Sequence, residues 1–291
     1  MFEWRLTDCI LKIGRRPLVM GIVNVTPDSF SDGGQYATAE SAIAHGLQLT
    51  EDGADLLDIG GESTRPGAAP VPLEEEMRRV VPVVAGLAAQ TRVPLSVDTS
   101  KAEVACRCLE SGARIINDVT ALAGDPAMAE VALKHGCGVI LMHMQGTPQT
   151  MQQAPHYEDV VAEIGQFFAQ RLKWAAAAGI TQEHIVLDPG IGFGKKGKHN
   201  LEILARLAEF QSLGRPVCLG VSRKALIGQI LQRPVAQRLA GSLAALLCAQ
   251  SRSAVQIVRV HDVRETRDAV EILAAIQEQG DDGGRPAGTT L

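Results

Sequence analysis

The stretch Leu18-Val19-Met20-Gly21-Ile22-Val23-Asn24 is a short apolar run that ends in a polar residue. Short apolar runs rich in β-branched residues are typical of strands that are buried on both faces of a parallel sheet. Seven similar runs follow, and a polar side chain stands at or near the end of each: residues 56–59, 95–97, 115–116, 139–142, 185–187, 217–221 and 257–260. The repetition predicts eight parallel strands.

Helical patterns lie between the predicted strands. Ser100 and Glu103 have the spacing of a capping box, which predicts a helix with Ser100 as its N-cap. A second helix is predicted before the C-cap residue Gly179 by apolar residues at helical spacing: Val160, Ile164, Phe168 and Leu172. Eight alternating strand–helix units predict a closed (β/α)8 TIM barrel, an α/β fold, as a single domain over residues 1–280. A doubly wound open sheet is the alternative, although such sheets more often have about five or six strands.

The composition excludes several classes of protein. Lys plus Arg number 28 and Asp plus Glu 33, a formal net charge of −5, whereas nucleic-acid binders have an excess of basic residues. No apolar run reaches the roughly 18 residues of a membrane span, and the charged N-terminus lacks the apolar core of a signal peptide. The six cysteines form no CxxC pair, which favours buried thiols in a reducing compartment. We therefore expect a cytoplasmic protein that binds neither nucleic acid nor membrane.

Two early loops are long for a barrel and rich in Gly and Pro, at residues 24–38 and 60–72. Loops of this length on the active face of a barrel are usually lids or binding loops. Residues 281–291 have the composition of a disordered tail.

Polar side chains at the strand ends would form a ring, because the carboxyl ends of barrel strands converge on one mouth. Asp98, Asn117 and Asp188 could offer a planar edge of acceptors and a donor to a flat heterocycle with amidine-like N–H groups. The alternative for Asp98 is a cap on the following helix. The full ring is Asn24, Asp58, Asp98, Asn117, His143, Asp188, Lys224, Arg259 and His261.

Cationic side chains gather at the other side of this ring. Ser222-Arg223-Lys224 follows the seventh strand, and Arg259 and His261 alternate at the end of the eighth. Loops in this region of a TIM barrel frequently bind phosphate, so the cations indicate a phosphate or diphosphate substrate. Asn24 and Asp28 on the first loop could hold Mg²⁺, which completes its shell with phosphate oxygens and water.

Two further patterns are weaker. Residues 192–197 match GxGxxG, but a Lys-rich turn precedes the next helix, so a shaped loop is favoured over a dinucleotide site. His143 and His261 are two potential zinc ligands, but no HxxxH pair accompanies them. The remaining histidines lie in predicted helices or outer loops and are expected to have no chemical role: His45, His135, His156, His184 and His199.

The segments at these strand ends resemble those of a known family. Residues 21–34 (GIVNVTPDSFSDGG) and 58–67 (DIGGESTRPG) resemble the two signature segments of dihydropteroate synthase. The resemblance runs in order from about residue 17 to 275. It continues through SVDTS at 96–100, INDV at 116–119, DPGIGFG at 188–194, GVSRK at 220–224 and RVHD at 259–262.

The resemblance implies a transferase of folate biosynthesis, a target of sulfonamides. It would condense 6-hydroxymethyl-7,8-dihydropterin diphosphate with p-aminobenzoate and release diphosphate. A homodimer and a Mg²⁺ ion held by Asn24 are implied as well, and the catalytic residues would be Asp98, Lys224 and Arg65.

The resemblance also assigns residues to each part of the site. The pterin pocket would be Asp98, Asn117, Met142, Asp188, Phe193, Gly220 and Lys224. The diphosphate would lie on Asn24, Thr64, Arg65, Arg259 and His261. The p-aminobenzoate side would be Phe30, Thr64, Pro66, Phe193 and Ser222.

Two alternatives remain at this point. One is a pterin-binding methyltransferase barrel, which uses similar Asp and Asn residues but has no evident need for the cations of the last two strands. The other is a non-catalytic pterin-binding protein, although the segments at residues 24–34 and 61–67 look intact.

Overall fold

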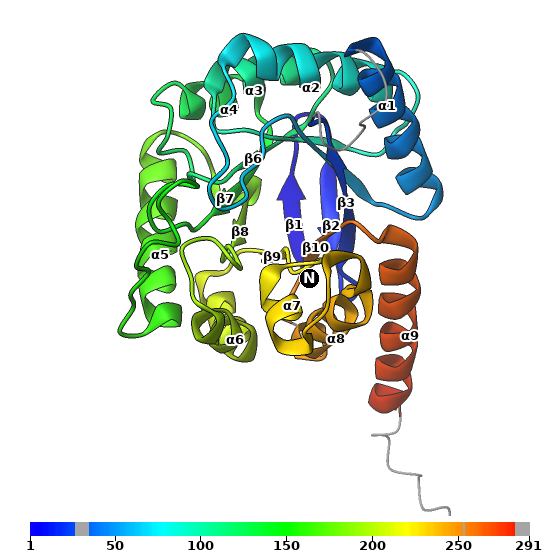
Figure 1. Ribbon diagram of the computed structural model, residues 1–291, viewed down its shortest axis with the longest axis vertical. Helices are drawn as coiled ribbons and strands as arrows, with labels where there is room; N and C mark the ends of the chain where they lie inside the picture. The colour runs from blue at the N-terminus through cyan, green and yellow to red at the C-terminus, as the bar shows by residue number, and fades with distance from the viewer. Residues whose placement is uncertain (27–34, 253, 283–291) are drawn as a thin grey trace, which may run out of the picture.

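The computed structural model describes residues 1–26, 35–252 and 254–282 of the chain. Its parallel strands are β3 (Leu18–Asn24), β4 (Leu56–Gly60), β5 (Leu95–Asp98), β6 (Ile115–Asp118), β7 (Gly138–Met142), β8 (Ile185–Asp188), β9 (Cys218–Leu219) and β10 (Ile257–Val260). They form one sheet in the order β8-β7-β6-β5-β4-β3-β10-β9. A bridge between Leu187 and Val217 joins β8 to β9 and closes the barrel (Figure 1). The predicted TIM barrel is confirmed, and the open-sheet alternative is wrong.

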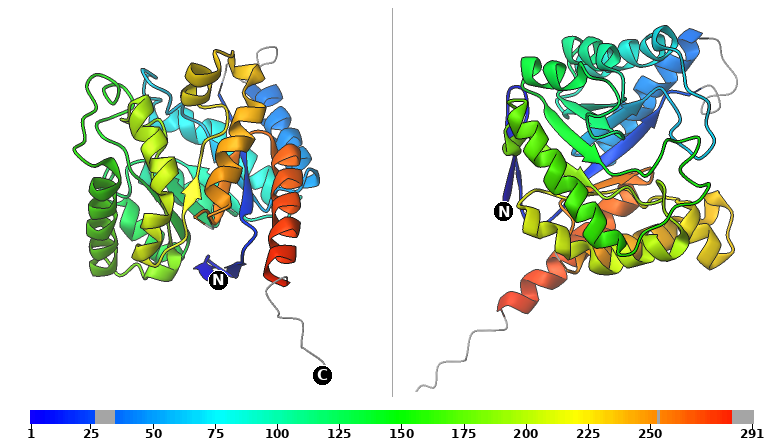
Figure 2. Two further views of the ribbon diagram at one scale, coloured as in Figure 1. Left: turned by 90° about the horizontal axis from the view of Figure 1, so that it is seen from below. Right: turned by 90° about the vertical axis from the view of Figure 1, so that its left-hand side faces the viewer.

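The helices surround this barrel, as Figures 1 and 2 show. Within the described residues they are α1 (Gln35–Glu51), α2 (Leu73–Ala88), α3 (Ala102–Glu110), α4 (Met128–His135), α5 (Val160–Ala177), α6 (Gly197–Arg206), α7 (Ala225–Leu231), α8 (Leu239–Gln250) and α9 (Val263–Asp282). Short 3-10 turns complete the ring at η2 (Gln182–His184), η3 (Leu207–Leu213) and η4 (Val235–Gln237). The described residues include no helix that is both long and apolar enough to cross a membrane.

The predicted helix before Gly179 is confirmed as α5. Its four apolar residues at helical spacing are buried, and Asp159 caps it by accepting the backbone N–H groups of Val161 and Ala162. The predicted capping box of Ser100 and Glu103 is wrong, because α3 begins one residue later, with Lys101 at the N-cap. The carboxylate of Asp125 accepts the first backbone N–H of α3 instead, at 2.9 Å from Ala102 N.

An N-terminal hairpin covers the barrel at the end where the parallel strands begin (Figure 2). Strands β1 (Phe2–Arg5) and β2 (Ile10–Ile13) pair in antiparallel fashion, and Trp4 donates its indole N–H to the carbonyl of His184 at 2.8 Å. The sequence patterns do not predict this hairpin. It packs on an apolar layer inside the barrel that consists of Met20, Leu56, Ile115, Ile140, Val186, Cys218 and Ile257.

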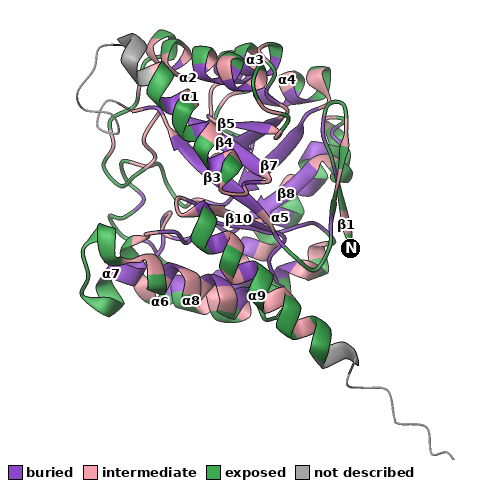
Figure 3. Cartoon of the chain, turned by 90° about the vertical axis from the view of Figure 1, so that its right-hand side faces the viewer, coloured by how far each residue is buried: buried purple, intermediate pink, exposed green. Residues whose placement is uncertain are grey.

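The strand period positions the polar ring directly above this apolar layer. Side chains two residues apart on a strand point to the same face. Each apolar residue at the bottom of the barrel is therefore followed, two residues further along, by one that faces the interior nearer the mouth. The pairs are Leu56 with Asp58, Ile115 with Asn117, Val186 with Asp188 and Ile257 with Arg259. Figure 3 shows that the barrel strands are buried throughout most of their length.

The structure gives the bounds of the segments near the mouth. The segment between β4 and α2 spans residues 61–72, and α1 begins at Gln35. Of the predicted loop at residues 24–38, residues 27–34 lie outside the described residues. Helix α9 extends to Asp282, two residues into the expected tail, and residues 283–291 lie outside the described residues. Strand β9 is shorter than the predicted 217–221, and just before it the N–H of Val217 donates to Oε1 of Gln256 at 2.8 Å.

Candidate active site

A shared ion pair lies at the centre of the barrel mouth. The guanidinium of Arg259 donates from Nε to Asp58 Oδ2 at 2.6 Å and from Nη2 to Asp98 Oδ2 at 2.9 Å. The amide of Asn117 donates to the same oxygen of Asp58 at 3.0 Å. Strands β4, β5, β6 and β10 thus supply one connected group. Its members come from sequence positions up to 201 residues apart, so no local motif reveals the connection.

This group has an excess of negative charge. Two carboxylates face one guanidinium, so the group bears a net charge of −1 when both are ionised. Burial raises the pKa of Asp98 above its ordinary value, the positive charge of Arg259 opposes that shift, and Asp58 adds to it. Among the described residues, Oδ1 of the fully buried Asp58 has no hydrogen-bond partner. The mouth therefore presents an electron-rich surface that suits a ligand with N–H donors.

Strand β8 brings a third carboxylate, that of Asp188, to this surface. Asp188 is buried and accepts the backbone N–H of Gly190 at 2.7 Å, and burial raises its pKa. The ammonium of Lys224 lies over the ring of Phe193, 4.3 Å from its centre. Burial lowers the pKa of Lys224 to about 8, while Asp188 opposes the shift. Carboxylate, ammonium and aromatic face together can enclose a flat polar heterocycle.

His261 and Ser222 face each other across the ends of β9 and β10. His261 Nδ1 lies 3.0 Å from Ser222 Oγ, which also accepts the backbone N–H of His261 at 3.2 Å. The hydroxyl can donate to Nδ1 or accept from it, and with the hydroxyl as donor the imidazole has its proton on Nε2. Burial lowers the pKa of His261 to about 4, and Arg223 and Arg259 add to the effect. This low pKa favours the neutral ring at pH 7, which can donate a hydrogen bond through Nε2 when Nδ1 accepts from Ser222.

Arg223, one of the cations that the sequence places after the seventh strand, does not face the mouth as a free cation. Its guanidinium is paired with the carboxylate of Asp262, 3.0 Å from Nε to Oδ2. Its backbone adopts a left-handed conformation, with φ at +57°. The backbone N–H of Arg223 donates to Ser242 Oγ, so the turn that leads into α7 is held from α8. Arg223 therefore fixes the turn that presents Ser222 and Lys224.

The loop of residues 61–72 is anchored at its base. Lys101 at the start of α3 is ion-paired with Glu62 of the loop and with Glu76 of α2, which is almost fully buried. Further along, the backbone N–H of Gly67 donates to the carbonyl of Pro148 at 3.0 Å, which joins the loop to the segment after β7. The sequence reasoning did not find Lys101, because it follows a predicted helix cap and resembles a surface lysine.

The loop residues assigned to the substrates stand at the rim. Thr64 is half-buried, and Arg65 and Pro66 are exposed. The positive charge of Arg65 reaches the mouth, because it lowers the pKa of both Lys224 and His261. Met142 and Gly220 are buried and half-buried at the ends of β7 and β9. Two other predicted positions, Asp28 and Phe30, lie outside the described residues.

Asn24 ends β3, opposite Gly60 of β4, and is half-buried. Among the described residues no hydrogen bond to its side chain is formed. Its amide oxygen is therefore open to a cation, and a single protein oxygen fits Mg²⁺, which keeps water and substrate oxygens in its shell.

A buried lysine organises the glycine-rich segment after β8. Lys195 donates from Nζ to the carbonyls of Gly190 at 2.9 Å, Phe193 at 2.8 Å and His143 at 3.1 Å. The same ammonium lies 3.0 Å from His143 Nδ1. Burial lowers the pKa of Lys195 to about 7 and that of His143 to about 3. The sequence places His143 in the polar ring because it follows β7. In the structure, His143 contacts Lys195 and so helps to hold the segment that contains Phe193.

This geometry also decides between the two readings of residues 192–197. Helix α6 begins only at Gly197, the last glycine of the match, and Gly192 and Gly194 lie in a loop before it, which favours the shaped loop over a dinucleotide site in this described segment. Gly190 and Gly194 adopt φ values of +67° and +63°. A Cβ added to Gly190 would lie 2.1 Å from the carbonyl oxygen of His143, and one added to Gly194 would lie 2.5 Å from that of Gln145. From the sequence, Lys195 is recognisable only as a member of a Lys-rich turn, and its role in this segment is not predicted.

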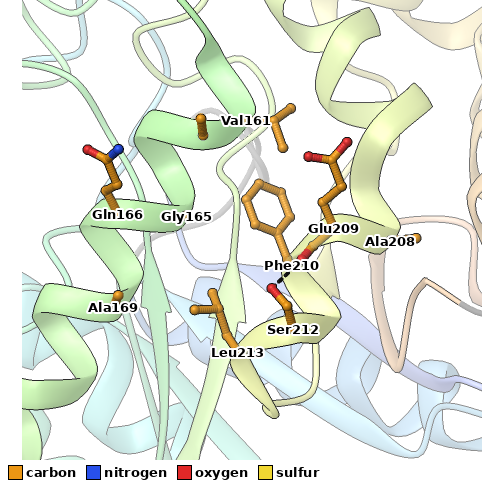
Figure 4. A pocket seen from close by; sticks show the side chains of 10 residues that line it. Val161, Gly165, Gln166, Ala169, Ala208, Glu209, Phe210, Ser212 and Leu213 are labelled. Atoms are coloured by element: carbon orange, nitrogen blue, oxygen red, sulfur yellow. Dashed lines mark hydrogen bonds between the residues drawn. The ribbon is translucent and has the colours of Figure 1, made fainter.

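A separate groove lies on the outer surface between α5 and η3 (Figure 4). Its volume is about 620 Å³, and its walls include Gly165, Ala169, Phe210 and Leu213. Glu209 is the single charged residue of the lining and is ion-paired with Arg206. The groove lacks the convergent polar groups of the mouth, so the chemistry belongs to the mouth.

Comparisons with known proteins agree with this geometry. Residues 20–261 match the family model of the pterin binding enzymes. The dihydropteroate synthase of Escherichia coli (strain K12) is 49% identical over 259 residues, which is 89% of this chain and 91% of the relative.

Solved structures agree as well. That of the Yersinia pestis dihydropteroate synthase with a sulfonamide drug complex has a TM-score of 0.89 and 46% identity, covering 95% of this chain and 100% of that one. The Xanthomonas albilineans dihydropteroate synthase with 4-aminobenzoic acid has a TM-score of 0.88 and 52% identity, covering 94% and 98%.

Fold and site therefore define a pterin-binding barrel enzyme. More narrowly, the chain belongs to the dihydropteroate synthase family. This membership decides in favour of an alkyl transferase and against the methyltransferase and non-catalytic alternatives.

Proposed function

We propose that the barrel mouth performs the family's reaction with the residues at its strand ends. A pterin diphosphate and p-aminobenzoate condense there to 7,8-dihydropteroate, and diphosphate leaves. The observation that supports this assignment is the division of charge across the mouth. Asp58, Asp98, Asn117 and Asp188 form its electron-rich side, and the ends of β9 and β10 form its hydrogen-bond-donating side.

The pterin ring would lie on the electron-rich side. Asp188 and Asn117 offer acceptors and a donor to its amidine edge, with Met142 and Gly220 as walls and Lys224 above Phe193 at the rim. A carboxylate held by a backbone N–H, as Asp188 is, is already oriented before the ligand arrives. This pre-orientation reduces the entropy that is lost on binding.

The diphosphate would lie against the donors of the opposite side. Negative charge builds on the bridging oxygen as the bond to the pterin methylene carbon breaks. His261 supplies an N–H from Nε2, Thr64 and Arg65 approach from the loop, and Arg259 stands behind them. Fixed donors at the site of developing charge lower the barrier to departure of the leaving group.

The methylene carbon becomes electron-poor as the leaving group departs. Asp98 stands next to the pterin site, in a group whose net charge is −1 when Asp58 and Asp98 are both ionised, and in that form it stabilises positive charge at that carbon. The amine of p-aminobenzoate attacks from the loop side, between Thr64, Pro66, Phe193 and Ser222, with Phe30 assigned by the family resemblance alone. After the C–N bond has formed, the amine nitrogen loses one proton, which passes to the released diphosphate.

Mg²⁺ would be held by Asn24 and by substrate oxygens. When bound, the ion neutralises charge on the diphosphate. Asn24→Ala should raise the concentration of Mg²⁺ that half-saturates the enzyme, and the variant should also bind Mg²⁺-diphosphate more weakly in the absence of pterin. If the half-saturating Mg²⁺ concentration and the affinity for Mg²⁺-diphosphate are both unchanged in Asn24→Ala, the assignment is wrong.

The assembly and location are proposals on the same basis. The family implies a homodimer, and the exposed apolar side chains of Ile230, Leu231 and Val235 on α7 and η4 are the kind of surface that a second subunit covers. A cytoplasmic location is supported by six free thiols, all of them in the described part of the chain.

Diphosphate release tests the function directly. Mixing both substrates with Mg²⁺ should release one diphosphate per dihydropteroate formed. Omission of p-aminobenzoate should abolish the release, and a sulfonamide should compete with p-aminobenzoate. Pterin binding without release of diphosphate would contradict the proposal.

A further inference from the structure

Three side chains with metal-ligating atoms meet on the outer ring, remote from the mouth. Helices α3 and α4 lie side by side in that ring (Figure 1). Cys106 Sγ lies 3.7 Å from Glu110 Oε1 and 3.8 Å from His135 Nε2. One ligand atom from each of the three residues lies within 4.8 Å of the other two. Among the described residues this is the one such group of three.

These separations are close to those of a tetrahedral metal site. Zinc holds thiolate sulfur at about 2.3 Å and imidazole nitrogen or carboxylate oxygen at about 2.0–2.2 Å. Two such ligands at a tetrahedral angle stand about 3.3–3.6 Å apart. The two sulfur distances exceed this range by one or two tenths of an ångström, and the ligand atoms of Glu110 and His135 lie within 4.8 Å of each other. Rotations of these exposed or half-buried side chains would close the site around an ion.

We propose that Cys106, Glu110 and His135 form a Zn²⁺ site with water as the fourth ligand. Thiolate, imidazole and carboxylate are all ligands that Zn²⁺ accepts. The two anionic ligands neutralise the charge of the ion, so the complex leaves no net charge on this half-exposed surface.

The local structure supports a cation at this position. Cys106 and Glu110 are four residues apart on α3 and therefore share one face of the helix. Arg107 donates to Glu110 Oε2 at 3.2 Å and leaves Oε1 toward Cys106. Both α3 and α4 end here, at Glu110 and His135, and the C-terminal end of a helix attracts cations. Two cations neighbour the group: Arg107 is also held by Glu103, and Lys134 is exposed to solvent.

The position also indicates what the ion does. The helices run opposite to the barrel strands, so these helix ends lie at the face away from the active site, where residues serve stability. Cys106 and His135 are 29 positions apart and belong to two different helices. The ion would therefore clamp α3 to α4 and have no part in the reaction.

Co²⁺ is the probe that tests the site, because a thiolate–Co²⁺ bond gives a charge-transfer absorption band. The full-length protein, reduced, stripped with a chelator and kept in excess Mg²⁺, should bind one equivalent of Co²⁺ and show that band. Zn²⁺ should displace the Co²⁺ and raise the Tm. Cys106→Ser should abolish the band, and His135→Gln should weaken Co²⁺ binding at least tenfold. Both variants should keep the diphosphate-release activity of the parent, which shows that they fold.

Matched controls come from residues outside the group. Cys248 is an exposed thiol and His156 an exposed imidazole, so Cys248→Ser and His156→Gln should both leave the band and its affinity unchanged. The proposal is wrong if the parent protein shows no charge-transfer band. It is equally wrong if the band persists in Cys106→Ser, or if it disappears in Cys248→Ser.

Discussion

Lys224 shows how the surroundings of one residue set the pH range of the site. Its ammonium lies over an aromatic ring and close to Asp188, but the cost of burying its charge outweighs both contacts and lowers its pKa to about 8. Below that pH the side chain is a cation that can bind an anionic or electron-rich ligand. Above it, the side chain becomes neutral and that attraction is lost.

Pterin affinity should therefore fall as the pH rises through about 8. The decrease can reach about tenfold per pH unit, since one proton must be taken up for binding. Lys224→Arg should bind more weakly at pH 7 but should lose little further affinity up to pH 9.5, because a guanidinium stays charged. Calorimetric titration of both proteins with pterin diphosphate between pH 7 and 9.5 measures this. Parallel slopes in the two proteins would contradict the role of Lys224.

At the scale of the element, the segment after β8 depends on backbone conformations that only glycine adopts easily. Gly190 has a φ of +67°, and an added Cβ would lie 2.1 Å from the carbonyl oxygen of His143. That carbonyl is also an acceptor of Lys195. A displaced backbone would therefore disturb the lysine that holds Phe193 in place.

Gly190→Ala should destabilise the protein and reduce its activity. Gly214 offers a matched control, because it has the same φ of +67° and open space around its Cα. The left-handed conformation alone costs an alanine about 1–2 kcal/mol, so Gly214→Ala should lose about that much. Gly190→Ala should lose at least about 2 kcal/mol more, through the steric clash. Denaturant unfolding of both variants, with activity measured in parallel, compares the two effects, and equal losses would show that no clash occurs.

The anchor of the 61–72 loop makes a second prediction at this scale. Lys101→Met leaves the buried carboxylate of Glu76 without its ionic partner, which should cost about 3 kcal/mol of unfolding free energy. Freeing Glu62 should also raise the KM for p-aminobenzoate more than it lowers kcat. Arg78→Met is the control, because its ion pair with Glu75 is exposed and should contribute at most about 0.5 kcal/mol. An unchanged KM in Lys101→Met would show that the anchor does not position the loop.

The contrast between Asp98 and Lys195 shows what sequence patterns can and cannot predict. Asp98 was predictable, because a polar residue that ends an apolar run must stand at a strand end and hence at the mouth. Its pairing with Arg259 was not, because the strand period fixes the face of a residue but not its partner across the barrel. The sequence places Lys195 only in a Lys-rich turn and gives no sign that its side chain is buried. Its burial depends on three carbonyls that converge only when the segment after β8 has folded.

At the scale of the whole molecule, the barrel brings strand ends and a loop into one electrostatic unit. The charge of Arg65 in the loop disfavours the protonated forms of Lys224 after β9 and of His261 after β10. Arg65 and the protonated Lys224 repel each other until an anion arrives. A diphosphate would turn that repulsion into a shared attraction and draw the loop toward the strand ends.

This coupling predicts an order of binding. In the proposed function, Thr64 and Pro66 of the same loop contribute to the p-aminobenzoate site, so this site should be complete only after the anion has bound. Titration of p-aminobenzoate should show an affinity at least tenfold higher with Mg²⁺-diphosphate than without it. Arg65→Ala should lose most of that enhancement and keep nearly the parent's pterin affinity, whereas Arg78→Ala on α2 should behave as the parent. Equal affinity for p-aminobenzoate with and without diphosphate would mean that the loop site is already formed in the free enzyme, and the two substrates would then bind independently.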